Sequence, residues 1–240
     1  MGSEQLNRVK TNIDGLDDML YGGIPEGNQI IVAGGPGTGK SLMSFEFLYR
    51  KAKEGVNSAF IALEEKPDML IRNVKSAFDF EDLDKLIKSE KLIIGGESTA
   101  TRLAAEGNSG SYSFGTVVSD MESIIKSNNA KCVVIDSLSL LKLIFEDNTE
   151  YRRSIVSLLA DLRRMGVTSI VTVEMEQSDR DSLKFGTEFF VFDGIIIFYE
   201  MGEENKRMLT SEIVKMRGTD HSWALVPYEI SRDGFKFYTV

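Results

Sequence analysis

One segment of this sequence carries residues whose types and spacing suit phosphate binding. It runs Gly34-Gly35-Pro36-Gly37-Thr38-Gly39-Lys40-Ser41 and satisfies the pattern G-x-x-x-x-G-K-[ST]. Glycines let the backbone turn tightly so that successive N–H groups point at phosphate oxygens, and a following helix adds a partial positive charge. Lys40 would then reach the β- and γ-phosphates, and the Ser41 hydroxyl would ligate Mg²⁺. The segment therefore predicts a site for ATP or ADP with Mg²⁺.

Acidic residues follow two of the apolar, strand-length runs. The run 131–136 ends in Asp136, where a carboxylate would stand beside the Mg²⁺ of a P-loop site. The run 58–63 is followed by Glu64 and Glu65, at the carboxyl end of the expected strand, which is the edge where open α/β sheets bind ligands. Either glutamate could orient or deprotonate an attacking water. From the residues alone, a plain turn aspartate and a solvated acidic turn stay open as alternatives.

The elements around these residues must hold them at one edge of a sheet. Apolar runs of strand length alternate with segments of helical period, which is typical of βα units around a mainly parallel sheet. We expect strands at 29–33, 58–63, 91–94, 131–136, 168–173 and 194–199, and helices at 40–54, 67–78, 114–127 and 149–164. The phosphate-binding segment thus lies between a strand and a helix, as its pattern requires.

After residue 199 the pattern changes to short strands at 208–217, 224–230 and 235–238, which predict an antiparallel extension of the same sheet. The stretch 95–113 is rich in Gly, Ser, Thr and Asn without a clear period, so we expect a mobile surface loop there. No repeat and no linker divides the chain, and a single α/β domain over residues 1–240 is expected.

Composition and charge exclude several classes of protein. No apolar stretch approaches the roughly 18 to 20 residues of a membrane span, and the N-terminus lacks the basic and apolar regions of a secretory signal. We therefore expect a cytoplasmic protein without membrane contact. The net charge of −9 disfavours a large nucleic-acid-binding surface. The one cysteine, Cys132, cannot form an internal disulfide and is expected to be a small core residue.

The opening residues 11–25, followed by the P-loop, resemble the KaiC-like branch of the RecA-superfamily ATPases. The resemblance continues through 63–65, 134–138 and 213–221 in the family's order and approximate spacing. It implies a RecA-like P-loop NTPase core and a homohexameric ring with ATP held between neighbouring subunits. A slow Mg²⁺-dependent ATPase that acts as a nucleotide-dependent switch, with an unidentified protein partner, is the function that this resemblance favours.

The resemblance also assigns roles to individual residues. The family's paired catalytic glutamates fall on Glu64 and Glu65, and its Mg²⁺-supporting aspartate falls on Asp136. Its K-x-R element, which reaches the γ-phosphate bound by the neighbouring subunit, falls on Lys215 and Arg217. By pattern alone, those two would be basic residues on a solvent-facing strand.

Two further positions match the family's pattern less decisively. His221, the only histidine, follows the K-x-R element and is interpreted as a turn residue without a catalytic duty. Glu174, at the end of the run 168–173, resembles a polar sensor position.

The sequence departs from KaiC itself, which carries two such domains in tandem where we expect one here. In the second KaiC domain, neighbouring Ser and Thr residues accept phosphate, whereas the stretch 187–193 has aromatic residues in their place. The chain therefore resembles the first, ATP-hydrolysing domain. A serine/threonine (auto)kinase, a DNA-dependent recombination or repair ATPase and a nucleotide-gated scaffold remain the alternatives.

Overall fold

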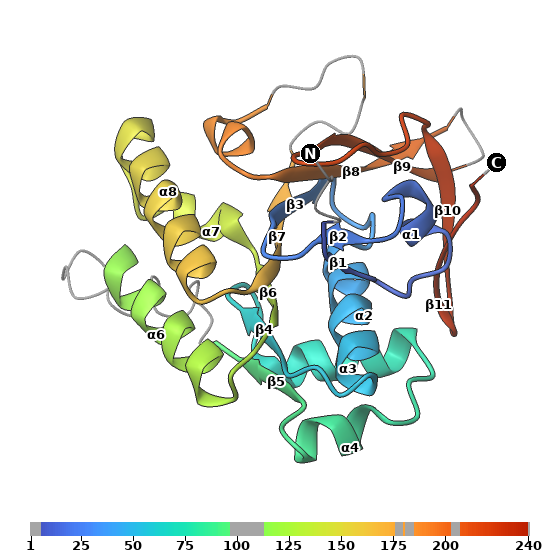
Figure 1. The fold of residues 1–240 in the computed structure, drawn as a ribbon, viewed down its shortest axis with the longest axis horizontal. Coiled ribbons are helices and arrows are strands. Elements are labelled where there is room, and N and C mark those ends of the chain that lie inside the picture. The colour runs from blue at the N-terminus through green and yellow to red at the C-terminus, as the bar shows by residue number, and fades with distance from the viewer. Residues whose placement is uncertain (1–5, 97–112, 176–179, 181–184, 203–206, 240) are drawn as a thin grey trace.

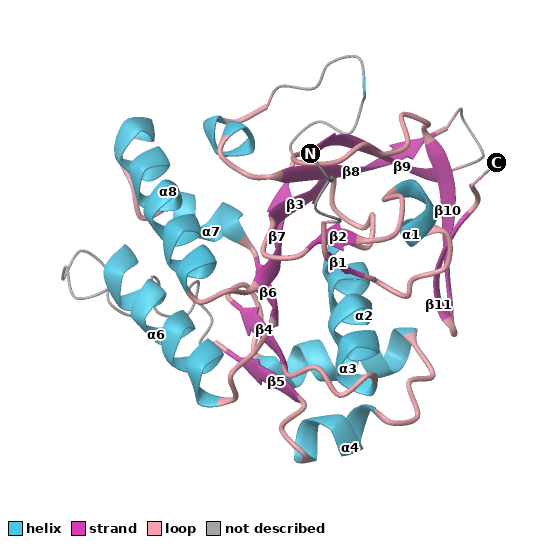
Figure 2. Ribbon diagram, viewed as in Figure 1, coloured by secondary structure: helices cyan, strands magenta, loops and turns pink. Residues whose placement is uncertain are grey.

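The fold is described from a computed structural model that covers residues 6–96, 113–175, 180, 185–202 and 207–239. Strands form the middle layer and helices cover both of its faces (Figures 1 and 2). The strands are β1 (Arg8–Val9), β2 (Ile24–Pro25), β3 (Gln29–Gly34), β4 (Ser58–Ala62), β5 (Leu92–Gly95), β6 (Cys132–Asp136), β7 (Thr168–Glu174), β8 (Gly194–Met201), β9 (Met208–Met216), β10 (Val226–Ser231) and β11 (Gly234–Phe237). The helices are α1 (Leu16–Met19), α2 (Lys40–Lys53), α3 (Pro67–Ala77), α4 (Leu83–Lys88), α6 (Phe114–Ser127), α7 (Leu138–Lys142), α8 (Asn148–Arg164) and the 3-10 helix η2 (Thr187–Phe190).

The main sheet has the strand order β11-β10-β9-β8-β3-β7-β6-β4-β5 within the described residues. From β8 to β5 each neighbouring pair is parallel, whereas β9, β10 and β11 are added in antiparallel fashion. The predicted fold class, a mainly parallel α/β sheet with antiparallel C-terminal strands, is confirmed.

The central strand β3 shows why these residues form a sheet covered on both faces. Successive residues of a strand point to opposite sides, so Ile30 and Val32 pack towards α2 while Ile31 and Ala33 pack towards α7 and α8. All six residues of β3 are buried. A parallel strand that is covered by helices on both faces consists of consecutive apolar residues, and the sequence of β3 shows this pattern.

Local sequence fixes where several helices begin. The Ser113 side chain accepts a hydrogen bond from the Thr116 N–H at the start of α6, and the Asp147 side chain accepts one from the Glu150 N–H at the start of α8. Pro67 occupies the first turn of α3, as predicted. Among the described residues no helix combines the length and apolar character that a membrane crossing needs.

The short elements α1, α4, α7, β1, β2 and η2 were not predicted from the sequence. Helices of four to six residues complete too little of the 3.6-residue period to be recognised by pattern. The predicted surface loop at 95–113 lies outside the described residues, apart from its two ends.

The C-terminal hairpin of β10 and β11 lies beside α2, the helix that follows the P-loop (Figure 1), and is bonded to it through Glu46. Glu46 of α2 is fully buried, and its carboxylate accepts hydrogen bonds from the Phe235 N–H at 2.8 Å and from the Arg50 Nε at 2.7 Å. The Tyr228 hydroxyl donates to the Thr38 carbonyl at 2.6 Å. Burial raises the pKa of Glu46, and the two hydrogen bonds oppose this rise. The hairpin and the P-loop are therefore held together by buried polar contacts.

Replacement of Glu46 tests this attachment. We expect Glu46→Ala to lower the free energy of unfolding by about 3 kcal/mol, because it leaves the Phe235 N–H and the Arg50 guanidinium without their buried partner. The control is Asp84→Ala on α4, whose carboxylate pairs with Lys75 at 2.7 Å in a pair that is exposed on both sides. Loss of one partner of an exposed pair costs far less stability. Urea unfolding measures both losses, and equal losses would contradict the attachment.

Candidate functional site

The P-loop leaves the carboxyl end of β3, the strand that lies between β8 and β7. Gly37 and Gly39 have φ angles of 78° and 89°, a left-handed conformation that favours glycine. At Gly39 a Cβ atom would also lie 2.7 Å from Ile230 Cδ1 and 2.8 Å from the Phe235 ring. Two glycines of the motif are therefore required by backbone conformation, and Gly39 by space as well.

Lys40 begins α2 inside this loop. Its Nζ donates to the Gly35 carbonyl at 2.9 Å, and the Thr38 hydroxyl donates to the same carbonyl at 2.8 Å. Burial lowers the pKa of Lys40, whereas the nearby carboxylates of Glu174, Asp136 and Glu64 act in the opposite direction. The ammonium group thus lies in a buried position that already faces negative charge, where a phosphate can also be bound.

A cavity of about 320 Å³ adjoins the loop and brings several predicted residues together. Its wall combines residues from the P-loop, from the ends of β4, β6 and β7, and from the C-terminal hairpin. The residues that line it are Pro36, Gly37, Gly39, Lys40, Ser41, Leu42, Glu64, Asp136, Ser137, Glu174 and Ile230. The carboxyl ends of neighbouring parallel strands meet at this edge, which is where open α/β sheets bind ligands.

Asp136, at the end of β6, is 5% exposed. Its carboxylate accepts hydrogen bonds from the hydroxyls of Thr172 and Ser41. Burial raises the pKa of Asp136, and these two hydrogen bonds oppose the rise. A carboxylate next to a hydroxyl is a set of hard oxygen donors, and proteins bind Mg²⁺ through one or two carboxylates together with substrate phosphates. Ser41 and Asp136 therefore fit the predicted Mg²⁺ site.

Glu64 and Glu65 point to different neighbours. The Glu64 side chain lines the cavity and accepts a hydrogen bond from the Ser137 hydroxyl. The Glu65 carboxylate accepts one from Asn73 of α3 at 2.9 Å. Burial raises the pKa of both residues, and the negative charge of Asp136 adds to this rise. Of the two, Glu64 lines the cavity beside the P-loop and Glu65 does not.

Lys215 and Arg217 lie away from this cavity. Lys215 pairs across the sheet with Ile195, which pairs with Ile31 in the first half of β3. Three strand residues, about 10 Å, separate Ile31 from Gly34, where the P-loop begins. The Lys215 ammonium donates to the Phe192 carbonyl at 2.6 Å, and burial, followed by the charge of Arg217, lowers the pKa of Lys215.

The Arg217 guanidinium donates to the Phe190 carbonyl at 3.1 Å and lies 3.5 Å from the Asp193 carboxylate. Neither cation of the K-x-R element lines the P-loop cavity of its own chain. The P-loop, Glu64 and Asp136 thus lie together at the carboxyl ends of the parallel strands. Lys215 and Arg217 lie towards the amino ends of the same strands.

The two remaining candidates differ in their surroundings. His221 is buried, its ring nitrogen lies 2.9 Å from the Ser222 carbonyl oxygen, and its ring packs on Trp223, as a structural turn residue would. Glu174 lines the P-loop cavity, and its backbone N–H donates to the Ser139 hydroxyl at 2.9 Å. Cys132 is buried, as predicted, and burial raises the pKa of its thiol to about 12.

Sequence reasoning missed four residues that shape the cavity. Ser137 and Thr172 hold the carboxylates of Glu64 and Asp136. Thr172 had a weak signal, a polar residue inside an apolar strand, and Ser137 directly follows Asp136. Ile230 and Tyr228 reach the P-loop through the folding back of the C-terminal hairpin, for which no local signal exists.

Comparison with known proteins decides the family. The family model described as "ATPase: KaiC" matches residues 9–240. The chain belongs to this KaiC ATPase family. It is 33% identical over 236 residues to the circadian clock oscillator protein KaiC of Picosynechococcus sp., covering 97% of this chain and 45% of that protein. It is 31% identical over 238 residues to the protein of the same name from Synechococcus elongatus, covering 98% and 45%.

A solved structure extends the family match to the fold. The KaiC-like protein from the hyperthermophilic archaeon Pyrococcus horikoshii OT3 superimposes with a TM-score of 0.82 at 30% identity, covering 98% of this chain and 100% of that one. The predicted resemblance to the KaiC-like RecA-superfamily ATPases is confirmed. The chain spans less than half the length of the curated KaiC relatives. Membership of the family therefore does not assign the activities of those whole proteins to this chain.

Removal of the Asp136 charge tests the electrostatics of the site. Because the pKa of Asp136 is higher in the folded than in the unfolded state, its ionised carboxylate lowers the free energy of unfolding at a pH above the folded-state pKa. This loss disappears as the pH falls towards the unfolded pKa of about 3.9. We therefore expect Asp136→Asn to raise the melting temperature of the nucleotide-free protein at pH 7.5, on a scale of about 2 to 4 °C per kcal/mol. The gain should shrink as the pH falls towards 4.

Calorimetric melting of both proteins between pH 4 and 8 measures this effect. The control is Asp68→Asn, an exposed aspartate on α3. With Mg²⁺ and ATP present the order should reverse, because only the unaltered protein gains stability from bound ligand through Asp136. A lower melting temperature for nucleotide-free Asp136→Asn at every pH would contradict the account.

Proposed function

We propose that the chain is a Mg²⁺-dependent ATPase that hydrolyses ATP slowly to ADP and phosphate, at sites shared between neighbouring subunits. One observation carries the proposal. The P-loop, Asp136 and Glu64 line a single cavity, whereas Lys215 and Arg217 lie towards the opposite edge of the same sheet. A site with its cations on another copy of the chain accounts for both groups of residues.

Nucleotide binding follows from the P-loop. Its backbone N–H groups and Lys40 would bind the phosphates, and Ser41 and Asp136 would hold Mg²⁺. When bound, Mg²⁺ supplies charge neutralisation at the phosphate oxygens. Thr172 keeps Asp136 oriented through its hydroxyl.

Hydrolysis requires a water to be oriented towards the γ-phosphate. Glu64, held by the Ser137 hydroxyl, would orient this water and accept its proton, because burial raises the pKa of Glu64 and so makes its carboxylate a stronger base. Glu65 would act through its contact with Asn73, which holds the middle of α3 against the segment that follows β4. Slow turnover is consistent with a switch.

The neighbouring subunit would supply Lys215 and Arg217. A cation that crosses an interface neutralises charge on the transferred phosphoryl group, so hydrolysis would depend on assembly. Both side chains are already directed by contacts to the backbone carbonyls of Phe190 and Phe192. A homohexameric ring is the assembly that the family resemblance favours.

The nucleotide state of such a ring would be readable as a change of shape. Switches of this kind work because γ-phosphate contacts hold elements that are released after hydrolysis. Two of the matched relatives are named circadian clock oscillator proteins. For this chain we propose only a nucleotide-dependent switch that signals to a protein partner in the cytoplasm.

Mixing of two inactive variants tests the shared site. Glu64→Gln/Glu65→Gln subunits retain the cations, and Arg217→Ala subunits retain the glutamates. Each variant alone should lose at least about 100-fold in ATP turnover. In random mixed rings, about a quarter of sites join an intact glutamate pair to an intact Arg217, so we expect about a quarter of the unaltered activity to return.

Arg163→Ala is the matched control for the arginine variant. Arg163 donates to the same Asp193 carboxylate at 2.9 Å but lies on α8 outside the K-x-R element. Its replacement should leave turnover within about threefold of the unaltered protein. If both variants assemble and bind ATP yet the mixture stays inactive, or if Arg217→Ala is fully active alone, the shared site is wrong.

A further inference from the structure

A second cavity, of about 540 Å³, lies next to the nucleotide cavity on the side of α7 and α8. It shares Pro36 and Glu174 with the nucleotide cavity but is otherwise formed by different elements. The residues that matter here are Ser139 and Lys142 of α7, Tyr151 of α8, Met175 after β7, Glu174 and Glu188 of η2. None of the roles proposed for the ATPase accounts for this space.

Glu188 gives the cavity a buried carboxylate oxygen that no hydrogen bond from the described residues satisfies. The residue is 5% exposed, and its Oε2 atom is buried and accepts no hydrogen bond from the described residues. A carboxylate removed from water is costly unless it is paired or hydrogen-bonded. The geometry therefore points to a donor that enters the cavity.

The Glu188 carboxylate lies against the backbone of Gly186, where there is no side chain. The φ angle of Gly186 is −63°, which any residue adopts, so the backbone does not require glycine there. A Cβ atom at Gly186 would instead collide with the carboxylate oxygens of Glu188. A side chain at position 186 would therefore have to displace the Glu188 carboxylate from its place.

The remaining lining indicates what kind of donor fits. Glu174 already faces the Lys40 ammonium of the P-loop. Lys142 is an exposed residue whose Nζ lies 5.8 Å from the centre of the Tyr151 ring. The buried Oε2 of Glu188 is then the acceptor of this lining that has no donor among the described residues, and a carboxylate oxygen of this kind matches a cation. Met175 and the Tyr151 ring provide an apolar wall, and an aromatic face also attracts cations.

We propose that this cavity binds an ammonium or guanidinium group carried on a short aliphatic chain, with Glu188 as its buried partner. The volume lies within the range of about 300 to 1,000 Å³ typical of small-ligand sites. The cationic group has two possible sources, a free aliphatic amine or guanidine and a lysine or arginine side chain of a second copy of this chain. Both place the same chemistry against Glu188.

Titration calorimetry on the whole chain tests the site with putrescine and agmatine as probes. 1,4-Butanediol is the uncharged analogue of putrescine with the same chain length. We expect saturable binding of both cations and none of the diol. Glu188→Gln should weaken cation binding at least tenfold, and Gly186→Ala should weaken it as well because it displaces the carboxylate.

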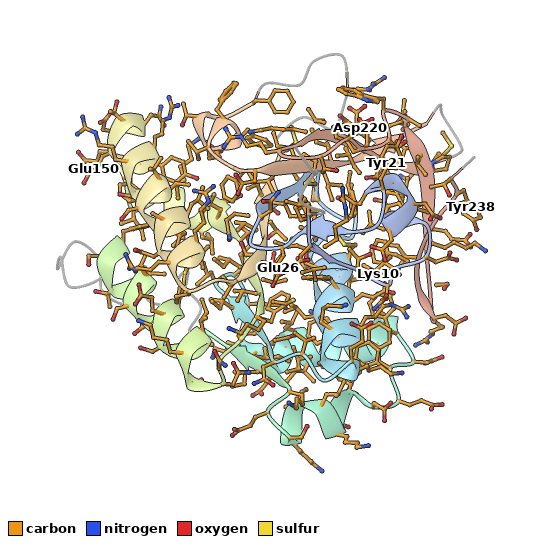
Figure 3. All side chains as sticks on the ribbon, viewed as in Figure 1. Lys10, Tyr21, Glu26, Glu150, Asp220 and Tyr238 are labelled. Carbon is orange, nitrogen blue, oxygen red and sulfur yellow. The ribbon has the colours of Figure 1, made fainter. Side chains whose placement is uncertain are left out.

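Glu150→Gln is the matched control. Glu150 precedes Tyr151 on α8 and points into solvent at the outer end of that helix (Figure 3). This variant should bind the cations as the unaltered chain does. Equal losses for Glu150→Gln and Glu188→Gln would reduce the effect to general surface charge and overturn the proposal.

Two further measurements separate the sources and exclude a purely structural role. If a second copy supplies the cation, Glu188→Gln should lower the particle mass of the unliganded protein; if a free molecule supplies it, the mass is unchanged and only calorimetry responds. Without ligand, Glu188→Gln should melt at the same or a higher temperature, because it removes the charge of a carboxylate whose buried Oε2 has no donor among the described residues. A lower melting temperature, with neither cation binding nor assembly affected, would show that Glu188 serves the fold alone.

Discussion

The buried carboxylate of Asp136 is the contact on which the geometry of the P-loop site depends. Its side chain accepts hydrogen bonds from Ser41 of α2 and Thr172 of β7, while its backbone carbonyl accepts from the N–H groups of Leu63 and Glu64 after β4. One residue therefore ties the P-loop helix to the ends of three neighbouring strands. Burial raises the pKa of Asp136, so the nucleotide-free site stores a cost that a bound cation would offset.

The same sheet separates the two groups of charged residues that the KaiC family resemblance assigns to one reaction. Asp193 fixes the second group, since its carboxylate accepts hydrogen bonds from Arg163 and from the Gln29 N–H and lies 3.5 Å from Arg217. The cations are thus held in place before any neighbour arrives. In the proposed shared site, charge preorganised in this way would cost little reorganisation at the moment of reaction.

Sequence alone predicted the residues whose role depends on local order. The P-loop follows from its spacing, and the strands β3, β4 and β6 follow from unbroken apolar runs, because parallel strands are buried on both faces. Residues that reach the site through distant folding could not be predicted. Ile230 and Tyr228 contact the P-loop because the C-terminal hairpin folds back against α2, where Glu46 accepts a hydrogen bond from the Phe235 N–H. Glu188 was not predicted either, because the cavity that it lines is formed by elements far apart in the sequence.

The central claim is that an active site needs two copies of the chain, and turnover measured against chain concentration tests it most directly. ATP hydrolysis per chain should fall towards zero on dilution, in step with the loss of assembled particles recorded by mass photometry, while nucleotide binding to the P-loop persists. This result would follow because Lys215 and Arg217 do not line the cavity of their own chain and would have to come from a second copy. Turnover per chain that stays constant while the particles dissociate to single chains would contradict the account.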